Sequence, residues 1–395
     1  MKTTVVGAGP VGLLLACELA LHGVRTTVLE RLTAQADTIK AQMISGRTYE
    51  MLAMRGFGHA IDAASEADAA RLAWHSRGST GHFAGLFKLD GLPLIMLMQQ
   101  TLERALEARA RELGVEIRRG VEVTELPDAD FVIGCDGGRS TVRKLAGFDF
   151  PGTGPSLTGY QAIVDLDGDL PFGWHRTPHG VHAFGPLKGR IMLMEFDGPP
   201  ETRDVTRESL EAALRRVSGR DVRITAVHTA TSWTDNTRQA TTYRRGNVLL
   251  AGDAAHVHSP FGGQGLNLGL QDALNLGWKL ATGDSALIDT YTTERHPVAE
   301  RVLRNTMAQV ALTRPDPQSR ELHAMFSDLL DLPEVKSRIS AMIQGTDIRY
   351  DTGCDHPLAG TFVPGLDLSD GKGTNIALNG LEATIRPDGY IEQIA

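Results

Sequence analysis

The chain opens with short apolar runs on either side of a glycine-rich break. Lys2–Val6 is a β-branched run, Val11–His22 is apolar with the length of a helix, and Arg25–Leu29 is a second β-branched run. Two strands joined by one short helix are parallel neighbours with a right-handed crossover. The pattern therefore predicts a βαβ unit at the start of a parallel sheet.

Further helices and buried strands extend this predicted sheet. Helices are expected at Ser45–Arg55, where Ser45 can cap the first turn, and at Thr101–Leu113 and Leu266–Ala281. Strands are expected at Val115–Ile117, Phe131–Cys135 and Val248–Ala251. Mostly helical stretches follow at Asp289–Ala311, Glu321–Leu330 and Glu334–Ile343.

Between residues 156 and 233 the pattern changes to alternating apolar and polar positions. Runs at Val181–Phe184, Ile191–Phe196 and Val222–Thr231 are separated by Pro and Gly turns, with one helix predicted at Ser209–Val217. This texture is typical of an antiparallel sheet. The fold class is therefore α/β, with a discontinuous Rossmann-like domain (1–155 and 234–300) and a mainly antiparallel sheet domain (156–233). A helical segment (301–350) and a poorly patterned, Gly/Pro/Asp-rich C-terminal appendage (351–395) follow.

Composition narrows the classes of protein that fit. The 395 residues carry 40 Lys and Arg against 48 Asp and Glu, a net charge of −8, which argues against a nucleic-acid partner. Cys17, Cys135 and Cys354 form no C-x-x-C pair, and their scatter is typical of a reducing cytoplasm. The apolar start is broken by glycines and followed by Glu18, so neither a signal peptide nor a membrane partner is expected.

A first motif lies at the break between the first strand and helix. It reads Gly7-Ala8-Gly9-Pro10-Val11-Gly12, and Glu30 ends the next strand 18 residues after Gly12. The first glycine permits a tight turn, the second lets the backbone approach a pyrophosphate, and the third lets helix and strand pack closely. The helix N-terminus adds free N–H groups, and Glu30 can accept ribose hydroxyls. The motif predicts a dinucleotide site but does not choose between FAD and NAD.

A second motif follows the buried strand Val248–Ala251. It begins Gly252-Asp253-Ala254-Ala255-His256 and continues Pro260-Phe261-Gly262-Gly263-Gln264-Gly265-Leu266-Asn267. The aspartate can accept hydrogen bonds from a polyol, and the glycines leave room for a large flat group against the backbone. If that group is a flavin, the amides of the following helix face the edge where charge accumulates on reduction.

Together these motifs resemble the class A flavoprotein monooxygenases related to para-hydroxybenzoate hydroxylase. The resemblance rests on GAGPVG (7–12), Glu30, GCDGGRS (134–140) and GDAAHVHSPFGGQGLN (252–267), and covers residues 1 to about 357. Within this family the chain is most similar to the hydroxylases that tailor aromatic polyketide antibiotics (angucyclines and anthracyclines) and to rifampicin monooxygenase. This similarity extends over the stretches TRQATTYRRGNVLLAGDAAH, GLQDALNLGWKLA and YTTERHPVAERVLRNT. The Rossmann-like domain would then bind FAD, and the antiparallel sheet would bind the substrate.

The resemblance also implies which residues contact the cofactor. Lys40 stands where the family usually has Arg, and the aspartate that Asp136 matches is often structural. The implied contacts are Gly7, Gly9, Pro10, Gly12, Glu30, Arg31, Lys40, Gln99, Val123, Asp136, Gly252, Asp253, Pro260, Gly262, Gly263, Gln264, Gly265, Leu266 and Asn267.

The activity that the resemblance implies is hydroxylation of an aromatic small molecule. NAD(P)H would reduce FAD, and O₂ would supply one oxygen atom through a flavin C4a-hydroperoxide. The flavin carries this chemistry, so no catalytic side chain and no metal are expected, and His256 and His258 are expected to pack or cap. Candidate substrate contacts are the large aromatic and imidazole side chains of the central region: Trp74, His75, Phe83, Phe184, Phe196 and Trp233.

Several alternatives stay open at this point. The same motifs fit a flavin oxidase that transfers no oxygen, a flavin-binding protein without turnover, and an enzyme that attacks an ansamycin antibiotic. A homodimer is also compatible with the sequence. The choice between NADPH and NADH is also open. The chain is short relative to the family between Glu122 and Asp130, near Ala281–Ser285 and after His356, where a thioredoxin-like third domain is usual. Either the protein is abbreviated or the sequence omits segments; we favour the second, because each shortening falls where a loop would be disordered, with 351–395 as a remnant of that domain.

Overall fold

The computed structural model describes residues 1–395 except 37, 39, 72–76, 84–86, 186 and 197–204, and only the backbone of 71, 77–83, 88, 90 and 91. Its first sheet has the order β15-β16-β7-β1-β2-β6. β1 (Lys2–Val6) lies between β2 (Arg25–Glu30) and β7 (Phe131–Gly134), and β6 (Glu116–Arg119) and β16 (Val248–Leu250) continue the parallel pairing on either side. β15 (Arg244–Arg245) closes one edge antiparallel. The predicted parallel sheet is confirmed.

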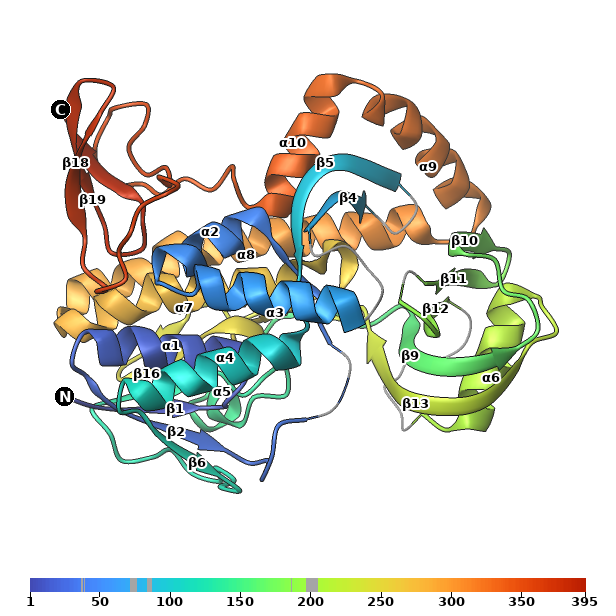
Figure 1. The fold of residues 1–395 in the computed structure, drawn as a ribbon, viewed down its shortest axis with the longest axis horizontal. Helices are drawn as coiled ribbons and strands as arrows, with labels where there is room; N and C mark the ends of the chain where they lie inside the picture. The colour runs from blue at the N-terminus through green and yellow to red at the C-terminus, as the bar shows by residue number, and fades with distance from the viewer. Residues whose placement is uncertain (37, 39, 72–76, 84–86, 186, 197–204) are drawn as a thin grey trace.

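Helices cover this sheet and bury its apolar residues (Figure 1). α1 (Pro10–Leu21) packs against both α7 (Gln264–Thr282) and α4 (Gln99–Glu112), and its leucines Leu13, Leu14 and Leu15 are fully buried. α2 (Gly46–Met54) is capped by Ser45, whose side chain accepts from the Thr48 N–H, as expected. The other helices of this region are α3 (Gly58–Arg71), α5 (Thr141–Leu145) and α8 (Ser285–Thr313).

The antiparallel sheet forms a second lobe, at the right of Figure 1. Its order is β10 (Gly173–Thr177), β11 (Gly180–Phe184), β12 (Arg190–Glu195), β9 (Thr158–Asp167) and β13 (Arg223–Thr234). One face packs against α6 (Arg207–Ser218) through Ile191, Leu193, Leu210 and Leu214. The opposite face contributes Val181 and Met194 to a cluster with Phe261 and Val310 of the first lobe. This second face is the one turned towards the motif at residues 252–267, and we call it the inner face.

Several elements were not expected from the sequence. β5 (Phe87–Met96) pairs antiparallel with β3 (Met43–Ser45) and β4 (Arg77–Phe83). Two helices that were expected, α9 (Pro317–Leu330) and α10 (Pro333–Gln344), pack beside it. Short strands β8 (Gly152–Thr153), β14 (Thr237–Gln239) and β17 (His256–Val257) join the two lobes. No helix of the described residues combines the length and apolar character needed to cross a bilayer.

The C-terminal region is better ordered than its sequence suggests. β18 (Thr374–Leu378), β19 (Leu381–Ile385) and β20 (Ile391–Ile394) form a small antiparallel sheet with a core of its own, including Ala383, Ile385 and Ile391. The buried Arg386 donates to Glu294 of α8 at 2.8 Å. The expectation of an appendage rather than a core is therefore wrong: the small sheet buries apolar residues together with Met54 of α2, and polar contacts such as that of Arg386 add to this attachment. That it is a remnant of another domain stays a prediction.

Candidate cofactor and substrate site

In the turn after β1, protein atoms fill the space beside Gly7 and Gly12, whereas the space beside Gly9 is open. Gly7 has φ +108°, and a Cβ there would collide with the carbonyl of Cys135, while a Cβ at Gly12 would collide with the carbonyl of Gly7. A Cβ at Gly9 would meet nothing within 4 Å. No side chain caps the first turn of α1, so its N–H groups face the same open side. These features fit a pyrophosphate at Gly9.

Glu30 is held beside this turn by backbone hydrogen bonds. Its Oε2 accepts from the Ala8 N–H at 2.8 Å and its Oε1 from the Leu32 N–H at 2.9 Å. The Val121 N–H donates to the Glu30 carbonyl at 2.9 Å, which brings the segment of Val123 alongside. A carboxylate oriented in this way can still accept hydroxyl donors, because each oxygen has a second lone pair. The geometry suits the ribose contact that the sequence predicts.

The second motif reaches the same edge of the sheet. β7 lies between β1 and β16, and parallel strands present their carboxyl ends on one side. Asp253 follows β16 in a short 3₁₀ turn and is exposed, and within the described chain no group hydrogen-bonds its carboxylate. Gly263 is left-handed at φ +62° with open space at its Cβ position, and α7 starts uncapped at Gln264. A flat ring can therefore approach the backbone here.

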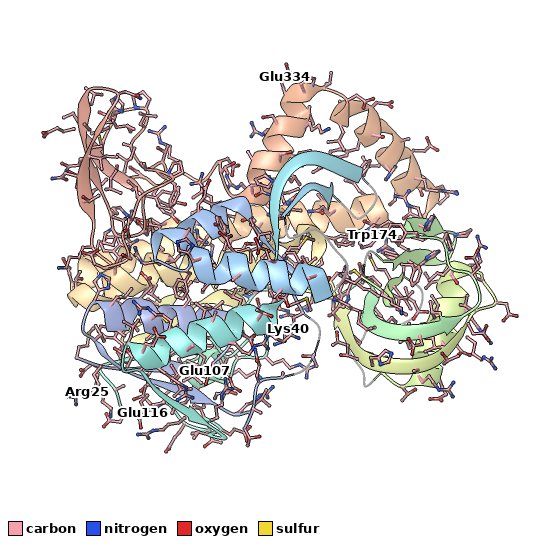
Figure 2. The ribbon with its side chains drawn as sticks, viewed as in Figure 1. Arg25, Lys40, Glu107, Glu116, Trp174 and Glu334 are labelled. Carbon is pink, nitrogen blue, oxygen red and sulfur yellow. The ribbon has the colours of Figure 1, made fainter. Side chains whose placement is uncertain are left out.

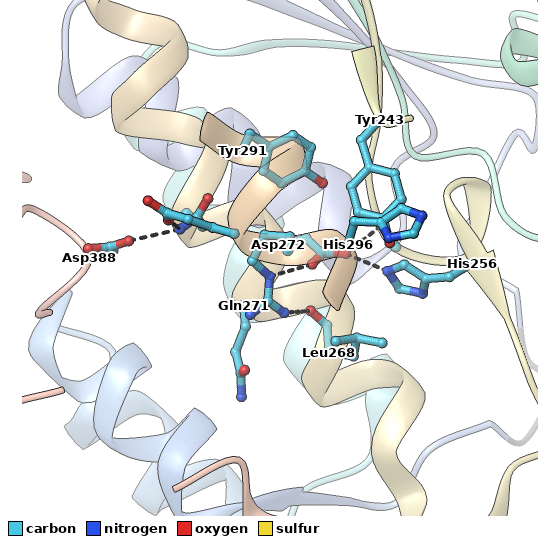
Figure 3. Close-up of polar contacts among 12 residues, drawn as sticks. Tyr243, His256, Leu268, Gln271, Asp272, Tyr291, His296 and Asp388 are labelled. Atoms are coloured by element: carbon cyan, nitrogen blue, oxygen red, sulfur yellow. Dashed lines mark hydrogen bonds and ion pairs between the residues drawn. The ribbon is translucent and has the colours of Figure 1, made fainter. Parts of the chain in front are cut away.

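A buried ionic network fixes this second motif from behind (Figure 3). Asp272 of α7 accepts from the Gly252 N–H at 3.1 Å, from His256 Nε2 at 2.7 Å and from Arg295 Nε at 2.7 Å. Arg295 also donates to the Leu268 carbonyl at 3.1 Å. Burial favours the neutral acid, but the charges of Arg295 and His256 outweigh it and hold the pKa of Asp272 below its usual range. The network joins the Gly252 turn, α7 and α8 into one rigid unit.

The two histidines of the motif occupy structural positions. His256 is fully buried with Nε2 bonded to Asp272, and His258 Nδ1 contacts the Ser259 carbonyl at 2.7 Å. Burial lowers the pKa of His258. These contacts agree with packing and capping, which stays a prediction until the variants are measured.

Other predicted cofactor residues differ in how their side chains are engaged. Asp136 accepts from the Thr141 N–H at 2.6 Å and the Val142 N–H at 3.2 Å, so it caps α5, and this favours the structural role. Gln99 starts α4 and donates to Glu103 at 2.8 Å. Lys40 is exposed beside the same end of α4 (Figure 2).

The remaining predicted contacts lie around the two turns. Asn267 accepts from the Ser45 N–H at 2.9 Å and donates to the Gly263 carbonyl at 2.8 Å, which ties the start of α7 to α2. Arg31 and Pro260 are exposed, whereas Pro10 is buried at the start of α1. Gly265 and Leu266 form the first turn of α7 and are partly buried.

The candidate substrate residues fall into three groups. Trp233 and Phe196 belong to the cluster of the inner face, with Val181, Met194 and Phe261. Phe184 pairs with Ile191 in register and packs in the cluster against α6, on the outer face, so this placement argues against a substrate contact. Trp74, His75 and the side chain of Phe83 lie outside the described residues.

Sequence reasoning missed several side chains of the inner face. Trp174 packs in the same cluster, where the antiparallel sheet meets the rest of the molecule (Figure 2). Gln161 and Arg190 also fall on this face by strand register. The alternation along β9 and β12 could have identified this face, but it could not show which of the two faces turns towards the second motif. That depends on how the lobes pack.

Comparisons with known proteins agree with this geometry. The FAD binding domain family matches residues 1–129 and 127–306. The 12-dehydrotetracycline 5-monooxygenase/anhydrotetracycline 6-monooxygenase of Streptomyces rimosus subsp. rimosus is 42% identical over 94% of this chain and 81% of its own length. A rifampicin monooxygenase of Streptomyces venezuelae is 36% identical over 93% and 83%.

Two further comparisons bear on the fold and on the range of reactions. The structure of OxyS anhydrotetracycline hydroxylase from Streptomyces rimosus superposes with a TM-score of 0.91 at 35% identity, over 100% of this chain and 96% of that one. A dialkyldecalin synthase of Streptomyces rugosporus is 36% identical over 88% of this chain and 81% of its own length. Similar chains therefore include one whose name describes a synthase rather than a monooxygenase.

Proposed function

This chain belongs to the FAD-dependent aromatic monooxygenases that share the FAD binding domain, and we propose that it hydroxylates a polycyclic aromatic polyketide with NAD(P)H and O₂. The observation that carries the proposal is the position of the inner face. The cluster of Val181, Met194 and Trp233 touches Phe261, which lies in the loop of the second motif. An aromatic ring held against this face therefore lies next to the proposed cofactor position.

The side chains of the site would bind and shield rather than react. Glu30 would hold the ribose, and the amides at the starts of α1 and α7 would hold the pyrophosphate and the ring edge of FAD. FAD supplies the oxygen-transfer chemistry when it is bound. The apolar cluster of Leu157, Val310 and Phe261 excludes water, which would otherwise compete with the aromatic substrate.

NAD(P)H is the reductant in this proposal. The parallel sheet carries a single dinucleotide motif, at Gly7–Gly12, so the reductant would visit briefly instead of occupying a domain of its own. Cys17, Cys135 and Cys354 are free thiols, which are typical of a reducing compartment, and the activity is therefore proposed for the cytoplasm.

Two other activities have support in a specific observation. The similarity to a dialkyldecalin synthase favours a cyclisation without oxygen transfer, and the similarity to a rifampicin monooxygenase favours attack on an ansamycin. Incubation under ¹⁸O₂ with NADPH separates them, using anhydrotetracycline, an angucyclinone and rifampicin as probes. We expect substrate-stimulated NADPH oxidation and a product heavier by one ¹⁸O atom with a fused-ring polyketide.

The other results of this experiment are equally informative. A product isomeric with its substrate would support cyclisation, and labelled product with rifampicin alone would support the ansamycin reading. NADPH oxidation that yields only hydrogen peroxide with every probe would indicate an oxidase.

A further inference from the structure

The inner face of the antiparallel sheet carries polar groups among its apolar residues. In the strand register, Trp233 of β13 lies opposite Gly159 of β9. Gln161 lies two residues further along β9, on the same face, and opposite Met192 of β12. Arg190 lies opposite Ile163, two residues further. Side chains at alternate positions of paired strands share a face, so these three residues form a diagonal row across β13, β9 and β12. We call it the donor row.

Each member of the donor row has a buried N–H donor without an acceptor. The atoms are Trp233 Nε1, Gln161 Nε2 and Arg190 Nε, and no group of the described chain accepts a hydrogen bond from them. Buried donors are nearly always satisfied in folded proteins, and an unsatisfied one costs about 1–3 kcal/mol. Three such donors on one face are therefore expected to have an external acceptor.

Arg190 is also a cation without a counter-ion. Its Nη2 donates a weak hydrogen bond to the Met192 sulfur at 3.0 Å, and no carboxylate of the described residues pairs with the guanidinium. Burial lowers the pKa of Arg190 to about 10, and no neighbouring charge offsets that effect. Arg190 is nevertheless protonated at neutral pH. The contact with Met192, the next residue on the same face of β12, places the guanidinium on the inner face.

The spacing of the row matches an extended planar ligand. Trp233 lies in the cluster with Phe261, next to the proposed cofactor position, and Arg190 lies four residues further along the register. At a rise of about 3.3 Å per residue and a strand spacing of about 4.8 Å, the row runs about 13 Å along the strands and about 10 Å across them. A fused-ring aromatic of three or four rings that lies flat on this face would therefore present one long edge to all three donors.

We propose that Trp233, Gln161 and Arg190 bind the oxygenated edge of the substrate, with Arg190 pairing to an anionic oxygen such as a phenolate or enolate. The inference rests on the proposed function, since it assumes that the inner face holds the substrate. It adds that the substrate is a polyoxygenated aromatic, ionised at the end distant from the cofactor. Guanidinium binding to an oxyanion would also satisfy the buried Nε and compensate the burial of the charge.

Binding to the oxidised holoenzyme tests the donor row without turnover. The probes are alizarin, which has an ionised phenol at pH 8, and its dimethyl ether, which has the same rings and cannot ionise. Dissociation constants are measured by quenching of flavin fluorescence for the wild type, Arg190→Met and Arg190→Lys. We expect the wild type to prefer alizarin, and Arg190→Met to weaken alizarin binding about 10- to 100-fold while leaving the ether within about twofold.

Controls separate this effect from a general loss of structure. Arg190→Lys keeps the charge and should retain part of the preference, while Arg223→Met removes an exposed arginine of β13 that pairs with Asp167 and should change neither constant. Trp233→Phe and Gln161→Leu should each weaken both probes by about 3- to 10-fold, because the quinone carbonyls of both accept hydrogen bonds.

The outcomes distinguish the two proposals. Equal binding of alizarin and its ether by the wild type, or equal weakening of both by Arg190→Met, would overturn the role of Arg190. Because no NADPH is present, the preference for alizarin can hold even if the ¹⁸O₂ experiment shows no oxygen transfer. Labelled product together with equal affinities would leave the proposed function standing without the donor row.

Discussion

At the scale of single residues, Glu30 is oriented by the protein before a ligand arrives. Both carboxylate oxygens accept backbone N–H groups at the mouth of the glycine turn. Glu30→Ala should therefore raise the dissociation constant for FAD at least tenfold, since hydrogen bonds to a charged group are worth about 1.5–3 kcal/mol. Titration of the apoprotein with FAD, followed by fluorescence, measures this. Glu116→Gln on the adjacent strand β6 is the matched control, and an unchanged constant in Glu30→Ala would refute the ribose contact.

Asp272 acts at the same scale but from behind the site. It is fully buried and bonds Gly252, His256 and Arg295. Asp272→Asn should lower the free energy of unfolding by about 3–5 kcal/mol, because it leaves the buried Arg295 without a counter-charge. Urea unfolding of the apoprotein gives this value. The double variant Asp272→Asn/Arg295→Met should recover part of the loss; if it is no more stable than the single variant, the ion pair is not the source of the effect.

At the scale of elements, two positions of the β1–α1 turn require glycine for different physical reasons. A Cβ at Gly12 collides with the Gly7 carbonyl, whereas a Cβ at Gly9 meets no protein atom and Gly9 has φ −76°, which alanine adopts freely. Gly9→Ala should therefore leave the melting temperature of the apoprotein within about 2 °C but weaken FAD binding at least tenfold. Gly12→Ala should prevent close packing of α1 and yield destabilised or insoluble protein.

The comparison of the two variants is the informative measurement at this turn. Thermal melts of the apoproteins report packing, and FAD titration reports the approach of the pyrophosphate to the backbone. A Gly9→Ala variant that binds FAD as tightly as the wild type would place the pyrophosphate elsewhere.

At the scale of the whole molecule, buried charges join regions that are distant in sequence. Glu294 of α8 pairs with Lys279 of α7 at 2.7 Å and with Arg386 of the C-terminal sheet at 2.8 Å. Arg55, the residue that follows α2, donates to Glu18 of α1 and to the Pro387 carbonyl, each at 2.7 Å. These polar anchors attach the C-terminal sheet to the proposed FAD-binding lobe.

This network predicts an acid-sensitive fold. Burial alone would raise the pKa of Glu294, but hydrogen bonds and charge from Arg386 and Lys279 lower it to about 2 from 4.5. The stabilisation is therefore complete above about pH 4.5 and is lost as the pH falls towards 2, with about 2 kcal/mol gone by pH 3. Burial lowers the pKa of Lys279 to about 8 from 10.5, so burying its charged form destabilises the fold at neutral pH. This destabilisation is relieved as the pH rises from about 8 to 10.5.

Urea unfolding between pH 3 and 6 measures the acid limb. Glu294→Gln should be less stable than the wild type at pH 6 and should lose about 2 kcal/mol less on going to pH 3. Glu321→Gln, which removes an exposed carboxylate of α9, is the control and should follow the wild-type profile. Parallel profiles of Glu294→Gln and the wild type would show that another group dominates the acid limb.

Much of the proposed FAD-binding lobe was readable from the sequence because its determinants are local. The order and parallel pairing of the strands follow from the βαβ pattern, and most predicted helices and strands lie within a few residues of those observed. Gly7 and Gly12 are confined by atoms of their own turn and the neighbouring strand, whereas the space beside Gly9 is open, so the motif predicts the geometry of the turn. The predictions failed where the pattern is weak, as in β5 and the C-terminal sheet, whose charged anchors lie far away in sequence.

The sequence by itself determined the nucleotide-binding turns, the parallel order of the first lobe and the family. Only the tertiary structure decided that Phe184 faces α6 while Gln161 and Arg190 face the second motif, and that Asp272 secures the Gly252 turn. The physical reason is that strand alternation assigns side chains to two faces without saying what covers each face. A buried charge, likewise, acquires its role only from the partners that packing brings to it.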